Sequence, residues 1–335
     1  MSERLLEITD LSVHFHTPEG VARAVDGIDF HLAAGETIGL VGESGCGKSV
    51  TSLSILGLVP SPPGRIESGK ILFEHQNLLD LDFESLRKIR GREISMIFQE
   101  PMTSLNPVLP IGRQVAEPLM IHQGLSKNMA FEKAADWMDY VKIPAASKRL
   151  NDYPHQLSGG MRQRIMIAMA LVCGPKLLIA DEPTTALDVT IQAQILSLMN
   201  QLKDELTMSL LLITHDLGVV AQMAARVVVM YAGQVVEAAG VIDIFDRPFH
   251  PYTQGLLKSI PQAGGRGKTR IKRLREIPGT VPRLTDTVFG CKFVDRCRYA
   301  FDLCRERQPD LWRIGPGHRA RCWLKEHPEC RRVNV

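Results

Sequence analysis

This 335-residue chain has no long apolar run. A helix that spans a bilayer needs about 20 consecutive apolar residues, and the longest candidate stretch, 208–231, is interrupted by His215, Asp216 and Arg226. Residues 1–5 lack the apolar core of a signal peptide. We therefore expect a cytosolic polypeptide, so that any work at a membrane must be done through partner proteins.

Cysteine and basic charge are scarce until the C-terminal part of the chain. Of the seven cysteines, only Cys46 and Cys173 precede residue 291, and such clustering in a cytosolic protein indicates metal binding before disulfides. Residues 251–335 hold 19 Lys and Arg against 8 Asp and Glu, a net charge of +11, whereas residues 1–250 have a net charge of −8. A basic tail fits nucleic acid, an anionic membrane surface, a bound anionic cofactor or simply a solvated surface.

Hydrophobic periodicity predicts an α/β protein with one large domain and a smaller one. Apolar and polar residues alternate over 5–33 with a turn at 17–20, which predicts antiparallel strands. Buried strands are expected at 37–41, 96–98, 177–180 and 210–214, with helices at 48–58 and 191–202. Between about residues 102 and 172 only helical spacing remains, so we expect a helical insert there, its methionines serving as core filler. Residues 264–268 indicate a linker before an irregular tail that contains the cysteines.

Residues 42–49 match the phosphate-loop pattern GxxxxGK[ST] between a predicted strand and a predicted helix. Glycines in such a loop let successive backbone N–H groups converge on phosphate oxygens. Lys48 is expected to contact the β- and γ-phosphates, and the Ser49 hydroxyl to bind Mg²⁺. The predicted nucleotide-binding residues of this segment are Gly42, Ser44, Gly45, Cys46, Gly47, Lys48, Ser49 and Val50.

Two adjacent carboxylates, Asp181 and Glu182, end the apolar strand predicted at 177–180. The carboxyl end of a buried strand is where ligands bind in α/β sheets. Asp181 is expected to hold Mg²⁺, through water. Glu182 is expected to polarise the attacking water as the general base.

Between the phosphate loop and these carboxylates stands Leu157-Ser158-Gly159-Gly160-Met161. The order phosphate loop, LSGG, apolar-Asp-Glu resembles the ATP-binding-cassette (ABC) ATPases over roughly the first 250 residues. The resemblance implies an ABC-type fold with a RecA-like core, an antiparallel β subdomain and a helical subdomain at about 102–172. It also implies that Ser158, Gly159 and Gly160 contact ATP bound by the opposite subunit, so that hydrolysis needs a dimer.

The same resemblance gives roles to residues outside these motifs. Gln99, in Gln99-Glu100-Pro101, resembles the Q-loop glutamine that reaches Mg²⁺ and the attacking water, and the segment after it would contact membrane subunits. His215 resembles the switch histidine that contacts the γ-phosphate, and Asp188, in Ala186-Leu187-Asp188, matches the loop that communicates across the dimer. Phe15 is the candidate for stacking on adenine, although core packing explains a strand phenylalanine equally well.

Four tail cysteines, Cys291, Cys297, Cys304 and Cys322, are separated by 5, 6 and 17 residues. Four cysteines suit either a tetrahedral Zn²⁺ or a [4Fe–4S] cluster. The spacing lacks the paired CxxC of zinc ribbons and also differs from the common ferredoxin pattern, so the spacing alone leaves the metal open.

A narrower resemblance covers this C-terminal region. Residues 247–253 (RPFHPYT) and 277–282 (IPGTVP), followed by the cysteines, resemble the ATPase subunits of oligopeptide and dipeptide importers, with the dipeptide-permease D type as the nearest subgroup. In that group the cysteines hold a [4Fe–4S] cluster, which implies the same role for the four positions above. Cys330 could replace Cys322 as the last ligand. Residues 1–250 would form the nucleotide-binding domain, and residues 251–335 a small irregular C-terminal extension.

The resemblance implies an ATPase subunit at the cytoplasmic face of a bacterial inner membrane that drives import of di- or oligopeptides. Its expected partners are a paralogous cassette, two permeases and, through them, a periplasmic substrate-binding protein. Nickel, opine or glutathione import by the same machinery is the nearest alternative. A soluble ABC ATPase with its basic tail on nucleic acid is a rival, but such proteins typically carry two cassettes or a long coiled coil. No nucleic acid is therefore expected.

Overall fold

An antiparallel sheet forms the N-terminal part of the computed structural model, which describes residues 3–99, 104–185, 187–259, 276–286 and 288–331. Strands β1 (Arg4–Thr17) and β2 (Gly20–Ala33) form the predicted hairpin, and β4 (Gly64–Phe73) and β5 (Gln76–Asn77) extend the sheet in the order β2-β1-β4-β5. One face of β1 is buried through Leu6, Leu11 and Val13, as the alternating pattern predicts. This confirms the strands expected over residues 5–33.

A second, eight-stranded sheet forms the centre of the molecule in the order β11-β12-β10-β9-β3-β8-β7-β6. Its members are β3 (Thr37–Val41), β6 (Ile94–Ile97), β7 (Leu177–Asp181), β8 (Ser209–Thr214), β9 (Arg226–Tyr231), β10 (Gln234–Gly240), β11 (Trp312–Gly315) and β12 (His318–Ala320). The run from β9 to β6 is parallel, and the other pairs are antiparallel. Every residue of β3, β7 and β8 is buried, which explains their continuous apolar runs.

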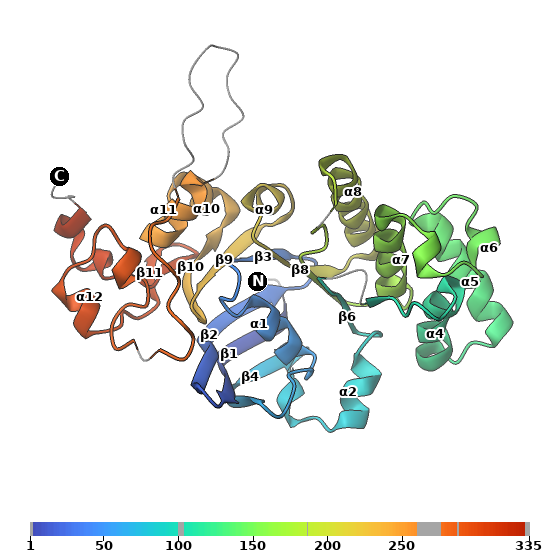
Figure 1. Ribbon diagram of the computed structural model, residues 1–335, viewed down its shortest axis with the longest axis horizontal. Coiled ribbons are helices and arrows are strands. Elements are labelled where there is room, and N and C mark those ends of the chain that lie inside the picture. The colour runs from blue at the N-terminus through green and yellow to red at the C-terminus, as the bar shows by residue number, and fades with distance from the viewer. Residues whose placement is uncertain (1–2, 100–103, 186, 260–275, 287, 332–335) are drawn as a thin grey trace, which may run out of the picture.

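Apart from residues 102–172, the helices up to residue 258 lie around the two sheets (Figure 1). They are α1 (Lys48–Ile55), α2 (Phe83–Ile89), α8 (Val189–Leu206), α9 (Leu217–Met223), α10 (Val241–Asp246) and α11 (Pro251–Lys258). Helix α1 ends three residues before the predicted boundary at 58, because Gly57 takes a left-handed φ of 59°. Short 3₁₀ segments are formed by Leu78–Asp80, Pro154–Gln156, Val294–Arg296, Trp323–Lys325 and Pro328–Arg331.

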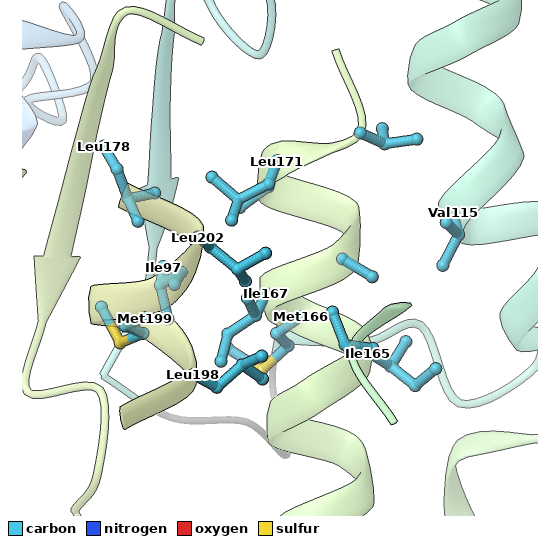
Figure 2. Packing of buried hydrophobic residues seen from close by; sticks show 14 of the residues in the cluster. Ile97, Val115, Ile165, Met166, Ile167, Leu171, Leu178, Leu198, Met199 and Leu202 are labelled. Carbon is cyan, nitrogen blue, oxygen red and sulfur yellow. The ribbon is translucent and has the colours of Figure 1, made fainter. Parts of the chain in front are cut away.

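The predicted helical insert forms α4 (Ile111–Gln123), α5 (Lys127–Tyr140), α6 (Ala146–Arg149) and α7 (Gly159–Leu171), at one end of the long axis (Figure 1). Its expected first residues, 102 and 103, lie outside the described residues. Figure 2 shows α7 side chains such as Ile167 and Met166 packed toward Leu198 and Leu202 of α8. Because α7 carries apolar residues on most of its surface, it is buried between α8 and the other helices. Most described methionines of the insert are core residues, as expected: Met138 and Met166 are buried, and Met120, Met161 and Met169 pack against the core. Met129 is an exception, because it is 52% exposed.

The C-terminal residues lie at the opposite end of the molecule (Figure 1). They include α12 (Asp302–Glu306) and the two short strands β11 and β12. Ala320 of β12 pairs with Glu237 of β10, so this segment extends the central sheet, which the expectation of an irregular tail did not include. The predicted linker at 264–268 lies outside the described residues. None of the described helices is long and apolar enough to cross a membrane.

Candidate functional site

The phosphate loop leaves the buried strand β3 and ends at the first turn of α1. Gly47, the residue before α1, has a φ of +104°, and a Cβ atom added there would lie 2.2 Å from the Ala24 carbonyl oxygen. Gly42 has a φ of +158°, and its Cβ would lie 2.3 Å from the Met230 carbonyl oxygen. Glycine is therefore required at both ends of the loop, where the backbone passes close to β2 and β9.

Lys48 is buried and directs its ammonium into the loop. Its Nζ donates to the Gly42 carbonyl at 2.8 Å and to the Glu43 carbonyl at 3.1 Å, with the Cys46 Sγ at 3.7 Å. A buried ammonium must be hydrogen-bonded, and the loop carbonyls meet that need here. The same donor lies where phosphate oxygens would be held at the helix N-terminus.

Asp181 is buried at the end of β7 and faces the phosphate-loop helix. Burial raises the pKa of its carboxyl and the Glu182 charge adds to that effect, whereas a hydrogen bond with Ser49 opposes it. Its Oδ1 atom is buried without a hydrogen-bond partner. An unsatisfied carboxylate oxygen beside a serine hydroxyl is a donor set that suits Mg²⁺, so the residues present fit the expected ion.

Glu182 gathers three other polar side chains around its carboxylate. Its Oε2 accepts from Gln99 Nε2 at 3.1 Å and from Thr185 Oγ1 at 2.9 Å, and its Oε1 lies 3.0 Å from His215 Nδ1. Burial would raise the pKa of Glu182, but the hydrogen bonds from His215 and Thr185 outweigh it and lower the pKa. The carboxylate is therefore ionised at neutral pH and can accept a proton from a water.

The backbone at Glu182 is itself in a sparsely populated region. Its φ of +47° is left-handed, which costs energy for a residue other than glycine. A backbone hydrogen bond from the Glu182 N–H to the Ile213 carbonyl, at 2.8 Å, holds this conformation. The turn directs the carboxylate toward Gln99 and His215 instead of continuing the strand.

The phosphate loop and Glu182 share one cleft of about 430 Å³, whose lining does not include Asp181 or His215. Its lining includes the phosphate loop from Ser44 to Val50 except Cys46, together with Gln99 and Glu182. At its other end lie Phe15, Thr17, Ala22 and Ala24 of the β1–β2 hairpin, and Leu284 of the C-terminal segment. The apolar end and the basic, glycine-rich end suit a flat base and a phosphate chain, respectively. Phe15 lines the cleft and also packs on the core.

Three predicted residues of the LSGG segment do not line this cleft. Ser158 caps α7 by accepting from the Met161 N–H at 3.4 Å, and Gly160 faces Ile191 of α8, which a Cβ would approach to 2.9 Å. Asp188 likewise caps α8, accepting from the Ile191 N–H at 2.9 Å. Residues 186 and 100–101 of the neighbouring motifs lie outside the described residues. One chain therefore brings together the phosphate loop, Asp181, Glu182, Gln99 and His215, but not Ser158, Gly159, Gly160 or Asp188.

The four predicted cysteine ligands, in contrast, do come together. Cys291, Cys297, Cys304 and Cys322 line one cavity with His250, Phe293 and Trp323, and Cys330 is not in that lining. All the cysteines are free thiols. Burial raises the pKa of Cys291 and of Cys322 to about 12 and that of Cys297 to about 11. Within the described residues, no three Cys, His, Asp or Glu side chains form a ready site for a metal ion.

The sequence reasoning missed several residues that contact the site. Thr185 binds Glu182, Leu284 lines the cleft, and Tyr252 and Arg296 contact Glu43 of the phosphate loop. Thr185 stands three residues after the strand-end carboxylate and could have been found as a local partner. The other three are distant in sequence from the nucleotide-binding motifs, although Tyr252 belongs to the RPFHPYT segment, and only the fold brings them there.

Comparison with known proteins defines the class. The ABC transporter family model matches residues 25–185, and the model of the oligopeptide/dipeptide transporter C-terminal region matches residues 236–304. A solved dimeric ATP-binding cassette bound to ADP and phosphate has a TM-score of 0.63 and 26% identity, covering 70% of this chain and 98% of its own. The fold is thus that of an ABC ATPase cassette, as predicted.

Relatives that match nearly the full length of this chain identify its family within the ABC ATPases. A probable peptide ABC transporter ATP-binding protein of Sinorhizobium fredii is 54% identical over 96% of this chain and 95% of its own length. The oligopeptide transport ATP-binding protein OppD of Bacillus subtilis is 50% identical over 98% of this chain and 91% of its own. This chain belongs to the family of ATP-binding subunits of oligopeptide ABC transporters, and it is an ATPase.

Proposed function

We propose that this chain hydrolyses ATP to drive the import of di- and oligopeptides across a bacterial inner membrane, from its cytoplasmic face. The observation that carries the proposal is the Glu182 constellation beside the phosphate loop. The peptide substrate rests on relatives whose names specify peptide transport.

The chemistry follows from the positions of the side chains. Lys48 and the loop amides would hold the β- and γ-phosphates, and Ser49, Asp181 and Gln99 would hold Mg²⁺, which supplies charge neutralisation for phosphoryl transfer. Glu182 would accept the proton of the attacking water, and Gln99 and His215 would orient the carboxylate and the γ-phosphate. Phe15 would stack on adenine.

The second half of each site would come from another cassette. Ser158, Gly159 and Gly160 stand at the N-terminus of the 13-residue helix α7, where the helix dipole and free N–H groups favour a phosphate. They lie outside this chain's own cleft lining, which supports their use on ATP bound by a partner. We propose a paralogous cassette as that partner, with Asp188 at the contact between the two.

Coupling to transport would pass through the segment after Gln99. Phe98, directly before Gln99, and Val108, nine residues after it, are 41% and 75% exposed. Exposed apolar side chains next to a catalytic glutamine suit contact with two permease subunits, which in turn would receive peptide from a periplasmic binding protein.

A stimulation assay tests this proposal. The assembled transporter should hydrolyse ATP faster when the binding protein carries a tripeptide than when it is empty. Equal rates of ATP hydrolysis with tripeptide-loaded and empty binding protein would contradict peptide as the substrate. If nickel or glutathione raised the rate instead, that compound would be assigned as the transported substrate.

We also propose that Cys291, Cys297, Cys304 and Cys322 hold a [4Fe–4S] cluster rather than zinc. Four thiolates are a donor set for either group. All four thiols line the same cavity and could therefore act as one ligand set. The choice of a cluster over zinc rests on the resemblance of this segment to the importer ATPases.

Anaerobic purification followed by iron, sulfide and zinc analysis tests the cluster. About four iron and four sulfide per chain are expected, and the Cys322→Ser variant should lose them. Cys330→Ser is the matched control and should keep them, because Cys330 is outside the cavity lining. One zinc per chain and no iron would contradict the cluster while leaving the ATPase assignment intact.

A further inference from the structure

The phosphate loop is held from outside the nucleotide-binding motifs by an ion pair with the cysteine-rich segment. Arg296 donates from Nη1 to Glu43 Oε2 at 2.6 Å and from Nη2 to Glu43 Oε1 at 3.0 Å. This is the bidentate fork that fixes a carboxylate in both position and orientation. Glu43 is the second residue of the phosphate loop, and Arg296 lies 253 residues further along the chain.

Arg296 is itself firmly placed. Its side chain is 6% exposed, and it also donates to the carbonyls of Pro278 and Ile277, at 3.0 and 3.3 Å. The Tyr231 hydroxyl lies 3.4 Å from Nη1. A guanidinium cannot lose its charge, so burial at this depth requires that its donors be met, and Glu43 provides the only carboxylate among these contacts.

A second contact reaches the backbone of the same loop residue. The Glu43 N–H donates to the Tyr252 hydroxyl at 2.8 Å. Tyr252 is fully buried, and its ring packs against those of Tyr231 and Phe293, with centroids 4.7 and 5.5 Å apart. The loop is therefore fixed through both its side chain and its backbone at Glu43.

Both contacts lead to the cysteine-lined cavity. Arg296 immediately precedes Cys297, and Phe293, which packs on Tyr252, lines the cavity together with Cys297. Nearby, Lys292 next to Cys291 donates to Asp26 of β2 at 2.7 Å. A change in the packing of the cavity would thus move the groups that hold the phosphate loop.

We propose that Arg296 and Tyr252 are positioning residues for nucleotide binding, and that through them the cysteine-lined cavity is energetically coupled to the phosphate loop. Arg296 holds the Glu43 carboxylate of the loop, and Tyr252 fixes the adjoining amide. The proposal rests on ATP binding in the cleft assigned above, and it adds a control of that binding from the C-terminal segment.

The first test measures nucleotide affinity on the full-length chain. Arg296→Met should weaken MgADP binding by about 5- to 20-fold in isothermal titration calorimetry, because Glu43 is left as an unpaired carboxylate and the phosphate loop loses the contact that fixes it. Tyr252→Phe keeps the ring and should weaken binding by a smaller factor. In the assembled transporter both variants should raise KM for ATP with kcat nearly unchanged, since neither residue is in the Glu182 constellation.

A double variant separates positioning from general damage. Adding Glu43→Gln to Arg296→Met removes the unpaired charge and should restore part of the lost affinity, whereas two independent structural lesions would add. Arg305→Met is the matched control, because Arg305 belongs to the same segment but only pairs with exposed Asp295 at 3.1 Å. Wild-type affinity in both Arg296→Met and Tyr252→Phe would overturn the proposal, as would an affinity lower in the double variant than in Arg296→Met.

Hydrogen exchange measures the coupling in the reverse direction, because such coupling is reciprocal. MgADP should slow amide exchange in the peptide covering residues 291–304 of the wild-type chain, and this effect should be lost in Arg296→Met. An equal effect in both proteins would contradict the link to the cavity. If the wild-type chain bound no nucleotide, the proposed function itself would fail, which is a different outcome from unchanged affinity in the variants.

Discussion

Asp181 and Glu182 are adjacent in sequence, but their surroundings shift their pKa values in opposite directions. Burial, with the neighbouring Glu182 charge, raises the pKa of Asp181, and Asp181 Oδ1 has no hydrogen-bond partner. For Glu182, hydrogen bonds from His215 and Thr185 overcome burial and lower the pKa. Two carboxylates whose pKa values are shifted in opposite directions can take different roles. One can bind a cation, and the other can accept the proton of the attacking water.

The raised pKa of Asp181 predicts that this side chain serves cation binding while it lowers the folding stability of the ligand-free chain. A carboxyl whose pKa is higher in the folded than in the unfolded chain stabilises the fold at pH values below its unfolded pKa. This contribution to stability is lost as the pH rises through the folded pKa. Ionisation of Asp181 is therefore less favourable in the folded chain than in the unfolded one. We expect Asp181→Asn to raise Tm by about 2 °C without ligand, for a gain of roughly 1 kcal/mol, and to abolish the further rise given by MgATP. A lower Tm in Asp181→Asn without ligand would contradict this account.

Glu182→Gln should reduce kcat by about 10²–10⁴-fold, because the amide cannot accept the proton of the attacking water. Nucleotide binding should survive, since the phosphate loop is untouched, and an ATP-bound dimer of cassettes should accumulate. Phosphate release and size-exclusion chromatography with ATP measure the two effects. Rapid turnover by Glu182→Gln would exclude its role as the base.

At the scale of single elements, Asp188 shows how a motif residue also supports a helix. Its carboxylate accepts the Ile191 N–H at 2.9 Å and caps the 18-residue helix α8. Asp188→Ala should lower the free energy of unfolding by about 1 kcal/mol, whereas Asp188→Asn keeps a capping oxygen and should not. Urea titrations of both variants measure this difference. Equal loss in both would show that charge, and not the cap, is what α8 needs.

The elements around the motifs could be predicted because they follow simple patterns. Strands β3, β7 and β8 are buried on both faces and appear as continuous apolar runs, and β1 and β2 alternate. Strands β11 and β12 could not be predicted, because they have four and three residues and carry Arg313, His318 and Arg319. Their place in the sheet is fixed by pairing with β10, which is a long-range contact. Glu182 and Lys48 stand in local sequence motifs, which predict them. Arg296 reaches the phosphate loop only through a long-range contact, so no motif predicts it.

At the scale of the whole molecule, the cysteine-rich segment supports the nucleotide-binding part. Glu237 of β10 is fully buried, and it accepts from the Phe249 and His250 N–H groups and pairs with His318 of β12 at 2.7 Å. Arg296 and Lys292 add contacts to the phosphate loop and to β2. The ATP cleft and the cysteine-lined cavity thus share one framework, and the segment cannot be treated as a detachable tail.

ATP hydrolysis by this chain is proposed to drive peptide uptake. The most direct measurement is accumulation of a labelled tripeptide in proteoliposomes that contain the permeases, both cassettes and the peptide-loaded binding protein, with ATP on the side of the cassettes. We expect uptake against a gradient that depends on ATP and falls to background with Glu182→Gln. ATP hydrolysis that depends on Glu182 but moves no peptide would contradict the account.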